Sequence, residues 1–194
     1  MISAVEYAVV NLGAIATLRA STPQLDFLAH HSWYDLDVDS AHRSMASRVL
    51  LRSESPEPDF TSNLVIQHFS LGRTEVVRLS ELDTTLDIAA LGDAVVLNHA
   101  VDLNGYLCVD DGTYRADGFQ LFVRRSQLAY ASADGKSMLS ILTATTPEQT
   151  WMTTNSEITE MEGRWLQTIT NTTSGASQGP TSPESFRCSS PTRY

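Results

Sequence analysis

The sequence has few cysteines, few basic residues and no long apolar run, and each shortage excludes a class of protein. Its only cysteines are Cys108 and Cys188, too few for the disulfide framework on which small secreted folds depend. Cysteines so far apart cannot form a zinc site without a pair of histidines near them. The sequence therefore argues against a structural disulfide and predicts no metal site and no cofactor.

Basic residues are also scarce. Lysine and arginine number 13 against 23 acidic residues, which gives a formal net charge of −10. Nucleic-acid binding and attraction to anionic membranes both rest on clustered basic side chains, so neither is expected. The acidity is compatible with a partner that has a basic face, or simply with solubility.

The apolar N-terminal stretch MISAVEYAVVNLGAIATLRA is the part that most resembles a targeting segment. It lacks the basic start of a signal peptide, Glu6 interrupts it, and it is too short to span a bilayer. The sequence as it stands therefore predicts a soluble cytoplasmic protein without membrane insertion. An upstream signal or lipobox outside this sequence would place it in the cell envelope instead.

The segment from Asp117 to Ile169 carries the strongest fold signal. Asp134-Gly135 suits a tight hairpin between two apolar runs. A helix is expected from Pro147, with Thr146 and Gln149 forming a capping box. Apolar residues recur on one face of this helix at Trp151, Ile158, Met161, Trp165 and Ile169.

The rest of the chain predicts more strands and two more helices. Residues 2–20 favour a helix with a stripe ending at Ile15, although Gly13 interrupts it. Residues 81–91 favour a helix of about three turns capped by Ser80 with Asp83. Strands are expected over 33–38, 48–52, 63–71 and 95–103, a loop over 53–59, and further glycine turns at Asn104-Gly105, Asp111-Gly112 and Asp117-Gly118.

These elements predict an α+β domain in which an antiparallel β-sheet packs against a long C-terminal helix and a shorter helix. We assign residues 1–31 to an N-terminal segment and 32–170 to the domain. Residues 171–194 are rich in Ser, Thr, Gly and Pro and are expected to be a disordered tail.

This order of elements resembles the PsbP-like superfamily and, within it, the actinobacterial LpqN/LpqT-type lipoproteins. The resemblance covers roughly Trp33 to Ile169, and it implies a PsbP-like α/β sandwich. Members are mostly binding or accessory proteins, including photosystem extrinsic subunits, a Ran-binding import factor, envelope lipoproteins and chaperones for secreted effectors. The residues that carry it, Phe60, Asn63, Leu142-Thr143-Ala144 and the Pro-Glu-Gln-Trp helix start, look structural, so no catalytic residue is transferred.

Several local patterns imitate functional motifs. Residues 175–179 match G-x-S-x-G, but no strand or helix flanks them as a nucleophile elbow requires. Asp35, Asp37 and Asp39 imitate the opening of a calcium loop, yet the Gly and Glu expected later are missing. Alternation would place these three aspartates on one solvated strand face.

Histidines and aromatic residues have structural interpretations beside functional ones. His30, His31 and Trp33 could form a metal site or a partner hot spot, but we favour Trp33 in the core beside solvated histidines. Other residues are interpreted as structural: His99 and His68 as core or rim histidines, Trp151 and Trp165 as core, Arg124-Arg125 as a solvated pair. Asn171-Thr172-Thr173 fits a glycosylation sequon.

No catalytic, metal-binding or cofactor-binding residue is therefore assigned, and the partner-binding residues are unknown. We expect a non-enzymatic binding or accessory protein, an adaptor or chaperone-like factor for a protein partner. A carrier of a small apolar ligand or lipid, with a pocket between sheet and helix, is the alternative. A small hydrolase is a remote alternative that would need a Ser or Asp beside a His in one cleft.

Overall fold

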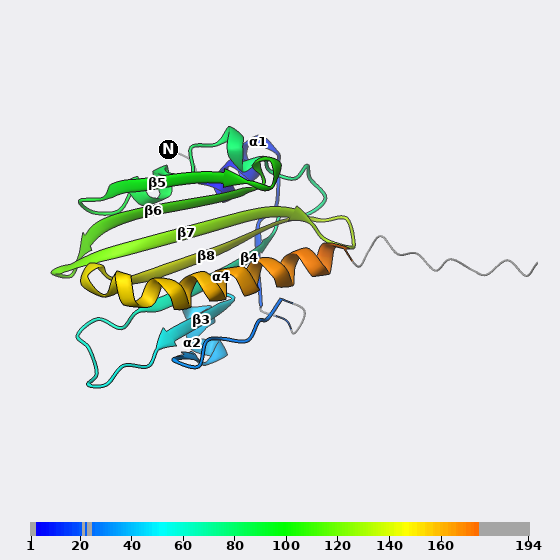
Figure 1. The fold of residues 1–194 in the computed structure, drawn as a ribbon. Coiled ribbons are helices and arrows are strands. Elements are labelled where there is room, and N and C mark those ends of the chain that lie inside the picture. The colour runs from blue at the N-terminus through cyan, green and yellow to red at the C-terminus, as the bar shows by residue number, and fades with distance from the viewer. Residues whose placement is uncertain (1–2, 21, 23–24, 175–194) are drawn as a thin grey trace, which may run out of the picture.

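The structure is a computed structural model that describes residues 3–20, 22 and 25–174, and an antiparallel sheet forms its centre (Figure 1). Across the sheet the strand order is β2-β3-β4-β8-β7-β6-β5, and β1 pairs with the end of β4 that β3 does not reach. The strands are β1 (Thr17–Arg19), β2 (Trp33–Asp35), β3 (Arg48–Arg52), β4 (Asn63–Ser70), β5 (Val95–Asp102), β6 (Leu107–Ala116), β7 (Phe119–Ala131) and β8 (Ser137–Pro147).

The helices lie on both faces of this sheet. They are α1 (Ala4–Asn11), α2 (Val38–Arg43), α3 (Leu86–Ala89) and α4 (Trp151–Ser174), with 3-10 turns at Leu79–Glu81, Leu103–Gly105 and Glu148–Thr150. The expected α+β class, with an antiparallel sheet, a long C-terminal helix and a shorter helix, is confirmed.

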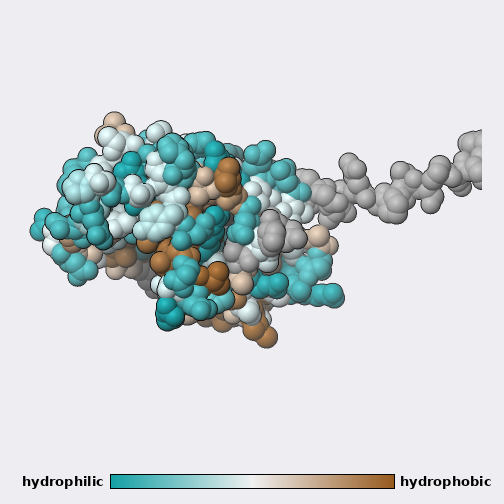
Figure 2. Space-filling view, turned by 90° about the horizontal axis from the view of Figure 1, so that it is seen from below, coloured by the Kyte–Doolittle hydropathy of each residue, from teal (hydrophilic) through white to brown (hydrophobic). Residues whose placement is uncertain are grey.

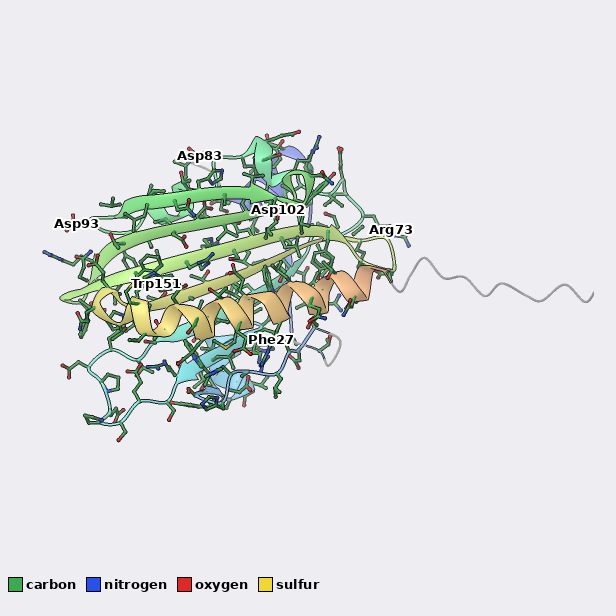
Figure 3. The ribbon with its side chains drawn as sticks, viewed as in Figure 1. Phe27, Arg73, Asp83, Asp93, Asp102 and Trp151 are labelled. Carbon is green, nitrogen blue, oxygen red and sulfur yellow. The ribbon has the colours of Figure 1, made fainter. Side chains whose placement is uncertain are left out.

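Helix α4 lies across one face of the sheet (Figure 1). The apolar stripe predicted for it is confirmed, because Ile158, Met161, Trp165 and Ile169 are fully buried. Trp151 is half-buried at the start of the helix and stacks on Phe122 of β7, with ring centroids 3.8 Å apart. Beside the helix, the segment before β2 adds Phe27 to the same core (Figure 3).

Smaller pieces cover the opposite face. There α1 and the segment 71–82 pack on Ile141 of β8, whereas its neighbour Leu142 faces α4. Near the β2 edge, α2 packs on Val49 of β3. The apolar core of the described residues therefore has one large cluster under α4 and two smaller clusters on the other face.

Three of the predicted glycine turns are confirmed. Asn104-Gly105, Asp117-Gly118 and Asp134-Gly135 each lie between consecutive strands. At Asp117-Gly118 both residues have positive φ, 51° and 83°, which fits the type I′ turn that joins tightly paired strands.

The turn predicted at Asp111-Gly112 is wrong, because both residues lie inside β6. A Cβ atom on Gly112 would lie 2.6 Å from Ile88 of α3 and 2.8 Å from the carbonyl oxygen of Val95. Glycine at this position therefore serves the close approach of α3 and β5 to β6, and it does not mark a chain reversal.

The start of α4 also differs from the prediction. Strand β8 continues through Pro147, and the 3-10 turn Glu148–Thr150 precedes the helix. Thr146 belongs to the β7–β8 ladder, so it does not form the expected capping box with Gln149. Strand pairing thus overrides the local capping signal.

The extended run predicted over 33–38 is wrong beyond Asp35. Strand β2 ends there, and α2 begins at Val38. Asp37 is its N-cap residue, since its side chain accepts a hydrogen bond of 2.9 Å from the backbone N–H of Ser40. Hydrogen bonding to Ser40 lowers the pKa of Asp37.

The N-terminal helix is shorter than predicted. It ends at Asn11, because Gly13 has a φ of 63° and residues 17–19 form β1. Its buried residues are Ala4 and Ala8, while Ile15 is exposed, so the predicted stripe is wrong. The predicted helix over 81–91 is likewise reduced to the short α3 and the preceding 3-10 turn.

Helix α4 extends to Ser174, four residues past the predicted end of the domain at 170. The G-x-S-x-G motif at 175–179 and most of the predicted tail lie outside the described residues. The boundaries 1–31, 32–170 and 171–194 stay predictions, although β1 and α1 of the first segment already pack into the sheet and its core.

Candidate functional site

An ion pair of low exposure joins α4 to the β2 edge of the sheet. Glu157 accepts hydrogen bonds from Trp33 Nε1 at 2.8 Å and Arg52 Nε at 2.9 Å, and Arg52 also contacts Glu54 at 2.8 Å. The hydrogen bonds from Arg52 lower the pKa of Glu157, and the same contact raises the pKa of Arg52. Trp33 therefore belongs to the core, as the favoured interpretation predicted.

A second carboxylate of α4 is buried against β7. Glu162 accepts a hydrogen bond from the Ser126 hydroxyl, and Arg124 Nε lies 3.2 Å from its other oxygen. On the opposite face of the sheet, Arg125 Nε donates to Asp87 of α3 at 3.0 Å. The prediction that Arg124 and Arg125 form a solvated pair is wrong, because both side chains are mostly buried. Arg124 pairs with α4 on one face of the sheet, and Arg125 pairs with α3 on the other.

A serine and a histidine are in contact within the core. Ser140 Oγ lies 2.7 Å from His68 Nδ1, and Trp165 Nε1 donates to the same oxygen at 3.0 Å. All three side chains are buried, and desolvation lowers the pKa of His68 to about 4, so its ring is neutral. The pair that a hydrolase would need is present, but it lies beneath α4 and not in a cleft.

His99 forms the other close pair of titratable groups. Its Nδ1 lies 2.6 Å from Asp110 Oδ1, and the aspartate is completely buried while the histidine side chain is 38% exposed. Two residues before Asp110, Cys108 is a free thiol whose burial raises its pKa. The satisfied ring nitrogen predicted for His99 is confirmed, but the valines around it are exposed on β5.

No metal centre forms among residues 3–20, 22 and 25–174, where no three His, Cys, Asp or Glu side chains could hold an ion together. Asp35 pairs with Arg48 at 2.6 Å, Asp37 caps α2, and Asp39 lies in its first turn. The three aspartates therefore do not share the strand face predicted for them.

The neighbouring histidines line a surface hollow of about 410 Å³. The ring centroids of His30 and His31 are 4.1 Å apart. Arg164 and Glu160 of α4 lie on the opposite wall and pair with each other at 2.6 Å. Leu28 and Ala29 complete its lining, and the charges of Arg164 and Glu160 neutralise each other.

An apolar cavity of about 390 Å³ lies beside the ends of β7 and α4. Leu128 and Tyr130 of β7, Ile169 of α4 and Tyr106 of the turn before β6 line it. Desolvation raises the pKa of Tyr130 to about 12. Among the described residues, no charged side chain belongs to its lining, which also includes Val76 and Leu103.

A smaller hollow of about 200 Å³, which we call the β2-edge hollow, lies at the junction of β2 and α2. Leu36, Val38 and Ala41 form its apolar wall, and the ion pair between Asp35 and Arg48 lies on its rim. Strand β2 and helix α2 thus place apolar side chains next to an ion pair at this hollow.

The segment that forms the β2-edge hollow carries exposed apolar side chains, of which Val38 lines the hollow itself. Tyr34 of β2, Val38 of α2 and Met45, just after α2, each expose more than half of their surface. These elements lie at the lower edge of the sheet in Figure 1. The space-filling view from below shows apolar residues gathered near the middle of this side of the molecule (Figure 2).

Sequence reasoning missed the two carboxylates that α4 turns toward the sheet, the partly buried Glu157 and the buried Glu162. Glu157 and Glu162 directly adjoin Ile158 and Met161 in the sequence, so they flank the buried stripe at its borders. This position is a weak signal, because it does not reveal the partner. Arg52, for example, lies 105 residues from Glu157.

Two further observations concern location. None of the described helices has both the length and the apolarity needed to cross a membrane. Asn171 is exposed on the last turns of α4, and the sequon that begins there stays a prediction.

No protein family model matches this chain, and neither does any curated protein. Among solved structures, the fold is similar to the crystal structure of LpqN, which is described as involved in cell envelope biogenesis of Mycobacterium tuberculosis. The two chains are 14% identical, the match covers 89% of this chain and 94% of LpqN, and the TM-score is 0.59. They share a fold. At this identity the likeness extends to the fold alone, and the wider PsbP-like relationship stays a prediction.

Proposed function

We propose that this chain is a non-enzymatic accessory protein, an adaptor or chaperone-like factor that binds another protein. The observation that carries the proposal is the apolar surface around the β2-edge hollow. Exposed aromatic and methionine side chains around a concave, partly polar site are typical of protein-binding hot spots. The Asp35–Arg48 pair would lie on the polar rim of such an interface.

The charge of the chain indicates which partner suits this surface. The net charge is −10, and Asp26 and Asp35 both contribute to the wall of the hollow. A partner segment that combines an apolar side chain with flanking basic residues would match it. The similar fold of LpqN, which is described as involved in cell envelope biogenesis, is compatible with an accessory role. An envelope location is part of the same proposal.

A capture experiment tests the protein partner. The full chain is immobilised beside the double variant V38K/M45K, and proteins retained from native lysate are identified by mass spectrometry. As a control, Met152→Lys adds charge at a residue that is 84% exposed on α4, away from the hollow. We expect a partner retained by the original chain and by Met152→Lys but lost by the double variant. Recovery of the chain alone, or equal retention by every variant, contradicts the proposal.

The second candidate function is a carrier of a small apolar ligand, favoured by the 390 Å³ cavity beside Tyr106 and Ile169. Anilinonaphthalene sulfonate, a dye that fluoresces in apolar sites, should bind the original chain. Ala131→Trp places a ring at the cavity wall and should reduce that fluorescence, whereas V38K/M45K should leave it unchanged. Dye binding that Ala131→Trp does not alter would remove this candidate.

A further inference from the structure

The outer edge of β5 is the most exposed apolar element of the described residues. Strand β5 is the last strand of the sheet at the top of Figure 1, and all of its residues are exposed. Figure 3 labels Asp93, two residues before the start of β5, and Asp102, its last residue. Such an edge presents a row of unpaired backbone donors and acceptors, ready to pair with another strand.

The side chains of this edge are mostly apolar. Each of five residues exposes more than a third of its surface: Val95, Val96, Leu97, Val101 and Leu103. Between Asp93 and Asp102 the only titratable side chain is that of His99. In a chain of net charge −10, the edge is a place where two copies can meet without opposing carboxylates.

We propose that β5 of a second copy of this chain pairs antiparallel with this edge, giving a two-fold dimer with one continuous sheet. The register follows from a bulge in the β5–β6 ladder between Val96 and Asn98. Beyond the bulge, Asn98–Asp102 is the regular part of the strand, and its central residue is Ala100. The two-fold axis passes through Ala100, the smallest side chain of this stretch.

This register makes the edge complementary to itself. Within the chain, Asn98 Nδ2 donates to Asp111 Oδ2 at 3.3 Å. Asn98 lies opposite Asp102 of the second copy, so the second N–H of the same amide can donate to that carboxylate, and symmetry repeats the contact. His99 lies opposite Val101 of the second copy on the other face. Centring the pair on His99 would oppose two imidazoles, and centring it on Asn98 would leave Asp102 opposite an alanine. The hydrogen-bonding pattern therefore selects Ala100.

The bulge and the short regular stretch limit the strength of this contact. Five paired residues with a few apolar flanks bury less than a standard interface, so dimerisation should depend on protein concentration. An extended segment of a different protein is the competing occupant. Such a segment would not repeat the contact between Asn98 and Asp102 by symmetry, and sedimentation of the chain alone distinguishes it from a second copy.

Sedimentation velocity of the full chain over a range of concentrations gives the dimer dissociation constant. Val101→Lys should raise this constant at least about tenfold, because a charge then lies opposite His99. The control Leu28→Lys makes the same change at a residue that is 80% exposed on the segment before β2, and should alter it less than about twofold. Circular dichroism and thermal midpoints establish that both variants fold. A monomer at every concentration overturns the proposal, as does a dimer that Val101→Lys does not weaken.

The register has its own test. Asn98→Asp opposes Asp102 of the second copy and should weaken the dimer, while Asn98→Lys should strengthen it. Directly opposed Cα atoms lie about 4.5–5.5 Å apart in an antiparallel pair, within disulfide reach. In a Cys188→Ser background, Ala100→Cys should therefore give an oxidised dimer and the off-axis Val96→Cys should not. Equal effects of the two Asn98 variants, or equal cross-linking at both positions, overturn the register.

Discussion

The two faces of the sheet are covered in different ways. On one face a single long helix, α4, inserts Trp165 and its apolar neighbours into one large cluster and adds the partly buried Glu157 and the buried Glu162. On the other face, α1, α2 and α3 are short and separate, and the apolar contacts form two smaller clusters.

This difference indicates where cooperative stability lies. Contacts under α4 link residues far apart in the sequence, so losing one should weaken the whole domain. A short helix on the opposite face can open alone, because fewer buried contacts hold it to the strands. The following predictions test this division, beginning with the largest expected effect.

Replacing Trp165 with alanine should destabilise the domain most. The side chain is fully buried and donates to Ser140, so we expect a loss of about 3–5 kcal/mol in the free energy of unfolding. Urea denaturation followed by far-ultraviolet circular dichroism measures it. The control Met152→Ala, on the exposed side of α4, should change it by less than about 0.5 kcal/mol. Similar losses in both variants would refute a dominant role for this face.

Glu162→Gln should be the next most destabilising change. It removes the buried charge that faces Arg124, and breaking a pair of this kind costs about 3 kcal/mol. Glu160→Gln is the matched control, since Glu160 pairs with Arg164 at the surface and should contribute about 0.5 kcal/mol or less. The same denaturation experiment applies. An equal effect of the two substitutions would show that burial does not strengthen the Glu162 contact.

The pH dependence of stability should show a contribution from His68. Its pKa is lowered from 6.5 to about 4 in the fold, so the unfolded chain binds a proton more readily between these values. Its stabilising contribution is therefore fully present above pH 6.5 and is lost as the pH falls toward 4. Between pH 7 and 4.5 this amounts to about 2–3 kcal/mol. Denaturation at several pH values should give a flatter dependence for His68→Gln, and an unchanged dependence would exclude this assignment.

The opposite face should respond weakly and locally. Ser3 and Glu6 form a capping box at the start of α1, with hydrogen bonds of 3.2 and 2.8 Å. Ser3→Ala should cost about 1 kcal/mol or less, mainly as faster amide hydrogen exchange within α1. Exchange in α4 should stay unchanged. A comparable acceleration in α4 would mean that the two faces unfold together.

The parts of the fold that could be predicted are those with long periodic patterns. The stripe ending at Ile169 is strong, because burial on one face of α4 fixes the spacing of its apolar residues. Boundaries were less predictable. Pro147 and Gln149 suggest a helix start, but the strand pairing of Thr146 outcompetes that local preference.

Short elements misled the prediction in a different way. The alternation of Asp35, Asp37 and Asp39 is typical of a strand, yet Asp37 ends the strand by capping α2. Gly112 follows an aspartate as turn glycines do, but it lies in a strand, where its missing side chain leaves room for Ile88. In both cases one residue type suits two structures, and only the neighbours in space decide between them.

The candidate site could be predicted even less. The β2-edge hollow combines Arg48 with Leu36 and Ala41, and α2 itself was not expected. Exposure of Tyr34 and Met45 depends on which element lies beside them, and composition does not contain that information. The contact between Ser140 and His68 likewise joins residues 72 positions apart.

The placement of the tryptophans has a consequence for experiment. Trp33, Trp151 and Trp165 are the three tryptophans of the chain, and all of them contribute to the layer between the sheet and α4. Intrinsic fluorescence at their emission band therefore reports on that layer alone. Local unfolding of α1 or α2 would not change this fluorescence. An unfolding curve recorded by tryptophan fluorescence would therefore describe only the half of the molecule that lies under α4.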